Sequence, residues 1–383
     1  MSNTITHVTP QLLARGLMTL RENVVFPRLV NRDYQGLAQA KGAVINIPKP
    51  SSITARSVTP SVTMNSNVDS APTTVAVTMD RWYEAPFQVS DQDMVETTGS
   101  ESFIPMQASE AVKALANDID SFIWGKHTGI YSQSGTAGTA PFATTISVAV
   151  SARTLLNSQL APMTDRRGVL DPSAEGAMLE LGSILKFDER GDQGGIINGE
   201  IGRKLAIDWY MDQNVSTYTP GTAWVAGWTF EATGTVGETT VTFTNATATG
   251  SILVGDVFSY SGQQYVITVV AAVAIAGTAV NALQFYPPLK TAGTTGLAVT
   301  IGAVAGTDYT ANLVFHRDAF AWVSRPLADT QGLGNAILAM TDPLSGVSLR
   351  LELSRQYRQT TYAYDYLGGA KLIRAEYATK ILG

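Results

Sequence analysis

A long, nearly uncharged segment in the second half of the chain constrains the fold most. Thr219 to Asn312 is 94 residues, of which five are charged, 19 are Thr and 12 are Gly. The spacing of its short β-rich runs is typical of a small barrel or sandwich. Because the flanking sequence differs on both sides, the segment is predicted to be an inserted all-β domain. The runs are Thr239–Thr244, Ser251–Tyr260, Gln264–Val270, Leu283–Tyr286 and Leu297–Ile301.

Composition limits the classes of function. The 383 residues suffice for two to three domains, and only 15% are charged, against about 25% in an ordinary soluble domain. A chain this poor in charge is expected either to have little solvated surface or to cover much of it with partners. The net charge of −6 argues against a main function in binding nucleic-acid phosphates. With no cysteine, disulfides, thiol catalysis and Cys-based metal sites are excluded.

The first half of the chain is predicted to contain two long helices and an extended hairpin between them. Thr9-Pro10 predicts an N-cap and the start of an amphipathic helix that ends near Val25. Its apolar stripe can pack on its own domain or dock on a neighbouring molecule. A second amphipathic helix is predicted from Pro105 to about His127. The two stripes are Leu13, Leu17, Leu20 and Val24, then Ala108, Val112, Leu115, Ile119 and Phe122.

Between these helices, two strands flank a long polar stretch. Val44–Pro48 and Thr74–Met79 have strand character, and the second continues through Trp82 to Val89. Ser51–Pro72 consists mainly of Ser, Thr, Val, Asn and Pro. A long stretch without a core of its own is usually functional or disordered. An extended hairpin arm is therefore predicted.

Mixed elements are predicted on both sides of the uncharged segment. Before it, helices are expected over Ser151–Leu160 and from Asp171-Pro172 to about Leu185, with a short apolar element at Leu205–Met211. After it, Leu313–Val323 has strand character. The alternation of Leu349, Leu351 and Leu353 with polar residues predicts a half-buried strand.

No catalytic, cofactor-binding or metal-binding residues are predicted. His7, His127 and His316 are scattered outside any ligand spacing, so each is expected to be a surface or packing residue. Asp118 and Asp120 should diverge around their helix, and no motif nominates another acid pair. Gly234–Thr240 lacks the lysine of a phosphate loop.

Two apolar features of the uncharged segment allow alternatives. Its aromatics Trp224, Trp228, Tyr260 and Tyr265 could stack sugars, but core packing is favoured. Tyr265–Tyr286 has the length and apolarity of a membrane span. It is rich in β-branched residues and lacks flanking Lys or Arg, so a buried hairpin is predicted instead.

The final stretch, Tyr364–Ala378, alternates like a strand, contains Gly368-Gly369, and is predicted to turn there into a second strand. Its Asp365-x-Leu367-x-Gly369-x-Lys371-x-Ile373-Arg374-x-Glu376 pattern resembles the C-terminal hairpin of tailed-bacteriophage major capsid proteins. Ala375 departs from that pattern, since Pro is common there. Leu253–Tyr265 resembles a strand-turn-strand unit in the inserted barrel of a podovirus-type coat subgroup.

The resemblance implies an α+β, Hong Kong-phage-type capsid fold with an inserted β-barrel. Its parts are expected in the order that family has. They are an N-terminal arm at 1–43, the extended loop with its flanking strands at 44–90, the spine helix and peripheral domain at 91–147, an axial domain at 148–218, the inserted barrel at 219–312, and the return to the axial and peripheral sheets at 313–383.

The implied function is non-enzymatic self-assembly of a coat protein, without cofactors, into hexamers and pentamers of an icosahedral shell around double-stranded DNA. The shell would be built in the bacterial host cytoplasm and become the virion capsid. The short N-terminal segment implies a separate scaffolding protein, and a portal would occupy one vertex. The loop Glu231–Thr240 is a candidate contact. The alternatives are an encapsulin-like cargo shell, a β-rich carbohydrate-binding adhesin, and a hydrolase with an unrecognised site.

Overall fold

The computed structural model describes residues 8–37, 44–50, 72–93, 103–182, 201–273, 279–327 and 336–383, with residues 53, 55, 57, 58 and 60. Two compact units share these residues. Unit 1 comprises Met1–Asn23, Arg32–Leu115 and Ala321–Ile373, and unit 2 comprises Val24–Asn31, Ala116–Phe320 and Arg374–Gly383. The fold is mixed α+β, as predicted. In the described part of the chain, no helix is long and apolar enough to cross a membrane.

The helices match the predicted periodicities. The α-helices are α1 (Val8–Asn23), α2 (Phe26–Leu29), α4 (Phe103–Trp124), α5 (Ser147–Ser158) and α6 (Pro172–Leu179). Short 3-10 helices are η1 (Gln35–Leu37), η2 (Gly125–Gly129), η3 (Arg317–Ala319) and η4 (Ala375–Tyr377). The stripe on α4 is buried as predicted, except that Ile123 rather than Phe122 completes it. Phe122 is half-buried beneath the Lys126 ammonium, 4.2 Å from its ring centre.

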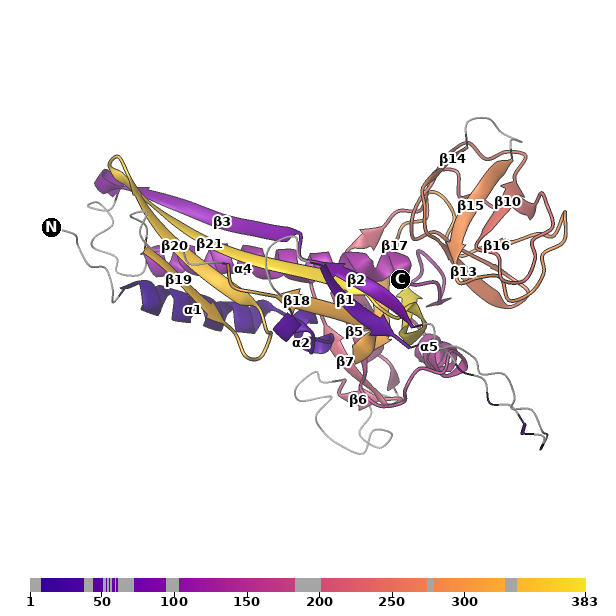
Figure 1. Ribbon diagram of the computed structural model, residues 1–383, viewed down its shortest axis with the longest axis horizontal. Coiled ribbons are helices and arrows are strands. Elements are labelled where there is room, and N and C mark those ends of the chain that lie inside the picture. Colours follow the sequence, from indigo (N-terminus) through magenta and orange to yellow (C-terminus); the bar gives the residue numbers. More distant parts are fainter. Residues whose placement is uncertain are drawn as a thin grey trace. The chain divides into compact units, whose positions relative to one another are not determined.

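Unit 1 is built on a long antiparallel sheet in which β21 is central (Figure 1). β21 pairs with β20 on one side and with β3 on the other. Helix α1 packs beside β19 and β20, and the Tyr364 hydroxyl donates to the Leu12 carbonyl at 3.1 Å. The predicted helix stripe thus packs on its own unit. The strands are β3 (Arg81–Ser90), β18 (Phe320–Ser324), β19 (Ala336–Thr341), β20 (Ser348–Gln356) and β21 (Gln359–Leu372).

The predicted turn at Gly368-Gly369 is wrong, because both glycines lie inside β21. A Cβ on Gly368 would stand 2.3 Å from the Trp322 ring, and one on Gly369 would stand 2.3 Å from the Thr78 carbonyl oxygen. These glycines therefore permit close approach rather than chain reversal. The reversal falls at Tyr357-Arg358, between the paired residues Gln356 and Gln359.

The extended hairpin is present. β1 (Val44–Lys49) and β2 (Thr73–Thr78) pair antiparallel from Val44↔Thr78 to Lys49↔Thr73. Its buried side packs on β18 and β21 through a cluster of Ile45, Ile47, Val77, Met79, Ala321, Val323, Leu367 and Ile373. Most of the polar stretch between the two strands lies outside the described residues.

Unit 2 contains a seven-stranded mixed sheet in the order β4-β22-β17-β5-β7-β6, with β8 paired to β17. Helices α5 and α6 bury their apolar residues beside it, in a cluster that includes Leu156, Met178, Trp209 and Ile381. The strands are β4 (Gln133–Ser134), β5 (Arg166–Leu170), β6 (Arg203–Lys204), β7 (Ile207–Met211), β8 (Thr217–Tyr218), β17 (Tyr309–His316) and β22 (Ala378–Leu382).

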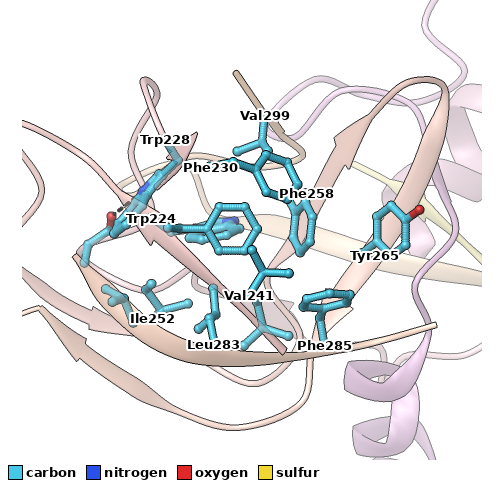
Figure 2. Close-up of a cluster of buried hydrophobic side chains, with 14 of the residues drawn as sticks. Trp224, Trp228, Phe230, Val241, Ile252, Phe258, Tyr265, Leu283, Phe285 and Val299 are labelled. Carbon is cyan, nitrogen blue, oxygen red and sulfur yellow. Dashed lines mark hydrogen bonds between the residues drawn. The ribbon is translucent and has the colours of Figure 1, made fainter. Parts of the chain in front are cut away.

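The uncharged segment forms a six-stranded antiparallel sheet, β16-β12-β13-β15-β10-β9, and a small sheet, β11-β14. Its aromatic residues make a shared core, with Phe258 stacked on Tyr265 at 5.2 Å (Figure 2). β13 and β15 pair antiparallel, as predicted for Tyr265–Tyr286. The predicted burial holds only in part, because Val269 and Val270 between them are 47% and 56% exposed. The strands are β9 (Thr229–Phe230), β10 (Thr240–Thr244), β11 (Gly250–Ile252), β12 (Val257–Tyr260), β13 (Gln263–Ile267), β14 (Ala271–Val273), β15 (Val280–Tyr286) and β16 (Thr300–Ile301).

Some predicted boundaries are wrong. α1 begins at Val8, so Thr9 is not its N-cap. Asp171 does cap α6, accepting from the Ser173 and Ala174 amides, but that helix ends at Leu179 rather than near Leu185. The single strand predicted over Leu313–Val323 is broken by η3, because the His316 ring accepts the Asp318 amide and starts a turn.

We expect Gly368→Ala to destabilise unit 1 by about 1–3 kcal/mol, since the new methyl group overlaps the Trp322 ring. The urea dependence of tryptophan fluorescence measures this change. Gly176→Ala is the matched control, because Gly176 is helical with open space around its Cβ direction, and we expect a gain of about 1 kcal/mol. Equal midpoints for Gly368→Ala and the wild type would contradict the close approach of Trp322.

Candidate functional site

The histidines and acidic residues of the described part of the chain show where chemistry-bearing side chains lie. Among them, no group of three or more His, Asp or Glu side chains could hold a metal ion. His7 lies outside the described residues. His316 is buried, and its Nδ1 accepts the Asp318 amide. The chemistry-bearing side chains instead take structural positions.

His127 is a buried packing residue. Its Nδ1 donates to the Trp124 carbonyl at 3.0 Å, and its ring lies 4.7 Å from the Trp124 ring and 5.7 Å from the Tyr218 ring. Burial, and then the charge of Lys380, lower the pKa of His127 to about 3. The imidazole is therefore neutral at physiological pH.

Lys380 on β22 is fully buried beside the uncharged segment, and the sequence did not reveal it. Its ammonium donates to the Gly255 carbonyl at 3.2 Å. The neighbouring Asp256 carboxylate accepts from the Leu253 amide at 2.8 Å, the Gly221 amide and the Tyr218 hydroxyl at 3.1 Å. Burial lowers the pKa of Lys380 to about 7, opposed by Asp256. This cluster fixes one end of the uncharged segment to β22.

Asp120 is a second buried carboxylate, and the sequence did not reveal its burial. It accepts the Val25 amide at 3.0 Å and the Phe26 amide at 3.1 Å, so it caps α2 from another helix. Burial, and then the charge of Asp212, raise the pKa of Asp120 well above its ordinary value. Asp118 is only half-buried, so the predicted divergence of the two carboxylates is confirmed. The sequence signal for this burial was the position of Asp120 directly after Ile119 of the predicted apolar stripe.

Unit 1 exposes a polar and aromatic surface on strand β3. Arg350 and Asp365 form a bidentate ion pair at 2.9 and 2.5 Å, and the Trp82 indole donates to the same carboxylate at 2.9 Å. Trp82 and Tyr83 are each 45% exposed, and the Arg81 guanidinium lies 3.7 Å from the centre of the Tyr83 ring. We call Arg81–Glu84 the β3 edge surface.

The composition of the β3 edge surface is that of a contact site. Tryptophan, tyrosine and arginine are enriched in protein–protein interfaces. Among the described strands β3 pairs with β21 alone, so it forms an edge of the described sheet. The β3 edge surface therefore has the residue types that suit a protein contact.

The aromatics of the uncharged segment do not form a sugar platform. Trp224, Trp228, Tyr260 and Tyr265 are at most 5% exposed, which confirms the predicted core packing. The indole N–H groups of Trp224 and Trp228 donate to the Val257 and Ala223 carbonyls, respectively.

Comparison with known proteins identifies the fold. No protein-family model matches the chain, and no curated protein matches it in sequence. Among solved structures, it is similar to one of Mycobacterium phage Che8, with 17% identity and a TM-score of 0.52 over 94% of this chain and 91% of that one. It is also similar to the capsid structure of the cyanophage P-SCSP1u, with 14% identity and a TM-score of 0.51 over 94% and 87%.

The chain therefore has the mixed α+β fold of phage capsid structures, of the Hong Kong-phage type. This confirms the Hong Kong-phage-type fold that the resemblance of the terminal stretch predicted, but not its inserted barrel. The match covers most of both chains, so it is a likeness of whole chains rather than of one shared motif.

We expect Lys380→Met to remove part of the pH dependence of stability. A lysine whose pKa is lower in the folded state than its ordinary 10.5 binds fewer protons than in the unfolded chain. The free energy of unfolding of the wild type should therefore rise between pH 7 and 10.5, by a few kcal/mol, relative to the variant. Urea unfolding at several pH values measures it.

Lys290→Met is the control for this titration, because Lys290 is an exposed lysine and lies between Thr219 and Asn312. If Lys380→Met and Lys290→Met have the same slope against pH, the Lys380 ammonium is solvated and the assigned burial is wrong.

Proposed function

We propose that this chain is the major capsid protein of a tailed bacteriophage. It self-assembles into hexamers and pentamers of an icosahedral head that encloses double-stranded DNA, and it has no enzymatic activity. The observation that carries the proposal is the fold likeness to a phage capsid structure over 94% of the chain. The C-terminal pattern around Asp365 and Arg374 supports it independently.

The physical character of the chain suits this function. Each subunit of a closed shell makes several modest contacts, and closure multiplies their effect. The low charge fraction and the exposed β3 edge surface are consistent with a subunit whose surface is largely covered by neighbours. Glu231–Thr240 remains a candidate contact.

We assign the parts in the order expected for this fold. Residues 1–43 are the N-terminal arm, 44–90 the extended loop, 91–147 the spine helix and peripheral domain, and 148–218 the axial domain. Residues 219–312 are an inserted β-barrel, and 313–383 return to both sheets. A bridge between Thr229 and Ala298, beside the two end strands of the six-stranded sheet, supports the barrel.

The partners follow from assembly. We expect a separate scaffolding protein, a portal at one vertex and packaged DNA held by proximity rather than by sequence-specific contacts. The assembled protein resides in the virion after assembly in the bacterial cytoplasm. The buried aromatics of the insertion leave the adhesin without its platform. An encapsulin-like shell would form closed particles, but its gene would lack terminase and portal neighbours.

Negative-stain electron microscopy of the purified protein, alone and with the product of its neighbouring reading frame, tests the proposal. Closed shells or capsomer rings are the expected result. A monomer in both preparations, together with binding to glycans, would overturn the proposal in favour of the adhesin.

We expect deletion of Pro60–Ser70 to leave a folded subunit that cannot form shells, because the extended loop carries contacts to the neighbouring subunit. Most of this stretch lies outside the described residues. Circular dichroism and sedimentation velocity measure folding and assembly separately. Replacement of the same residues by a Gly/Ser linker of equal length controls for chain connectivity. Intact shells from the deletion variant would contradict the role of the loop.

A further inference from the structure

The C-terminus of α5 has a leucine where helices usually place glycine. The Ala161 amide donates to the Leu156 carbonyl at 3.0 Å, and the Leu160 amide donates to the Asn157 carbonyl at 3.1 Å. These two bonds define a Schellman motif with Leu160 at the C′ position. The motif needs a left-handed residue there, and Leu160 has φ +60°.

Leu160 gains nothing from packing that would offset this conformation. Its side chain is 86% exposed, and that of Met163, three residues on, is 67% exposed. A leucine in the left-handed region is disfavoured, and glycine would remove the strain. Strain of this kind tends to persist where a residue has a function outside the isolated subunit.

A buried arginine holds this turn in place. The Arg166 side chain is 2% exposed, its Nε donates to the Pro162 carbonyl at 2.7 Å, and its Nη2 donates to the Ala161 carbonyl at 2.8 Å. The Arg317 amide also donates to the Asp165 carbonyl at 3.3 Å. We call residues 159–165 the Leu160 loop. Its backbone is fixed at both ends, so binding through it would require little further ordering.

We propose that the Leu160 loop is a docking element that inserts Leu160 and Met163 into an apolar site on a second copy of this chain. The choice of partner rests on the proposed function. Two apolar side chains are too small a contact to hold a lone dimer against the entropy of association. They suffice where closure repeats the contact, as in a shell of identical subunits. The exposed Asp165 supplies a charged rim beside the apolar pair.

Leu160→Gly tests the proposal without the usual risk of misfolding, because glycine suits the C′ position. We expect the variant to keep or raise the melting temperature, by about 1–3 °C. We expect its critical concentration for assembly, measured by light scattering, to rise about tenfold or more. Leu160→Asn, a polar residue that tolerates the left-handed region, should behave in the same way.

Ser261→Gly is the matched control. Ser261 is an exposed residue with φ +50° in the turn between β12 and β13, and it carries no apolar side chain. This variant relieves similar strain, so its assembly should equal that of the wild type. A loss of assembly in both variants would indicate that backbone relaxation, not the leucine side chain, is responsible, and would overturn the proposal.

A photoreactive amino acid at position 160 separates this proposal from the proposed function. The expected result is a crosslink between copies, identified by mass spectrometry of mixed light and heavy chains. Such crosslinks without shells would retain the docking element and overturn the capsid assignment. Shells that form at the wild-type concentration from Leu160→Gly, with no crosslink from position 160, would overturn the docking element and retain the capsid.

Discussion

The contact between the Trp322 ring and Gly368 of β21 is the constraint on which the long sheet of unit 1 depends. Trp322 is fully buried, and any Cβ at position 368 would stand 2.3 Å from its ring. A Cβ on Gly369 would stand at the same separation from the Thr78 carbonyl oxygen, so β2 and β18 both reach β21 because two adjacent side chains are missing. With no turn there, β21 continues for 14 residues and gives β3 and β20 a common partner.

The same residues show why the sequence predicted some elements and misplaced others. The stripes of α1 and α4 follow from spacing along one helix, which is local information. A glycine pair signals either a turn or a close approach. Only Trp322 and Thr78, which are distant in sequence, decide between the two. The break between β17 and β18 likewise depends on the His316 ring accepting the Asp318 amide, in a run whose apolar residues alone predict one strand.

The buried charges were missed for a related reason. Lysine and aspartate are usually solvated, so Lys380 and Asp120 carry no motif that nominates them. Their sequence context did hold a signal, since Lys380 stands in the run Ala378–Leu382 and Asp120 follows the stripe of α4. What the sequence could not provide is the partner. The Gly255 carbonyl and the amides of Val25 and Phe26 reach these side chains only through the tertiary fold. The candidate contact surfaces share this limit, because exposure of Trp82 or Leu160 is a property of the folded chain.

At two sites in this protein, glycine stands where a larger residue is usual and leucine stands where glycine is usual. The two sites differ in whether contacts within one subunit explain the residue. At position 368 the backbone is extended, a conformation that any residue can adopt. The residue there is glycine because a neighbouring ring leaves no room for a Cβ. At position 160 the backbone is left-handed, a conformation that favours glycine. The residue there is leucine, although its side chain is 86% exposed. The first choice is explained within one subunit. The second is unfavourable within one subunit, so its explanation lies in what the leucine contacts outside it.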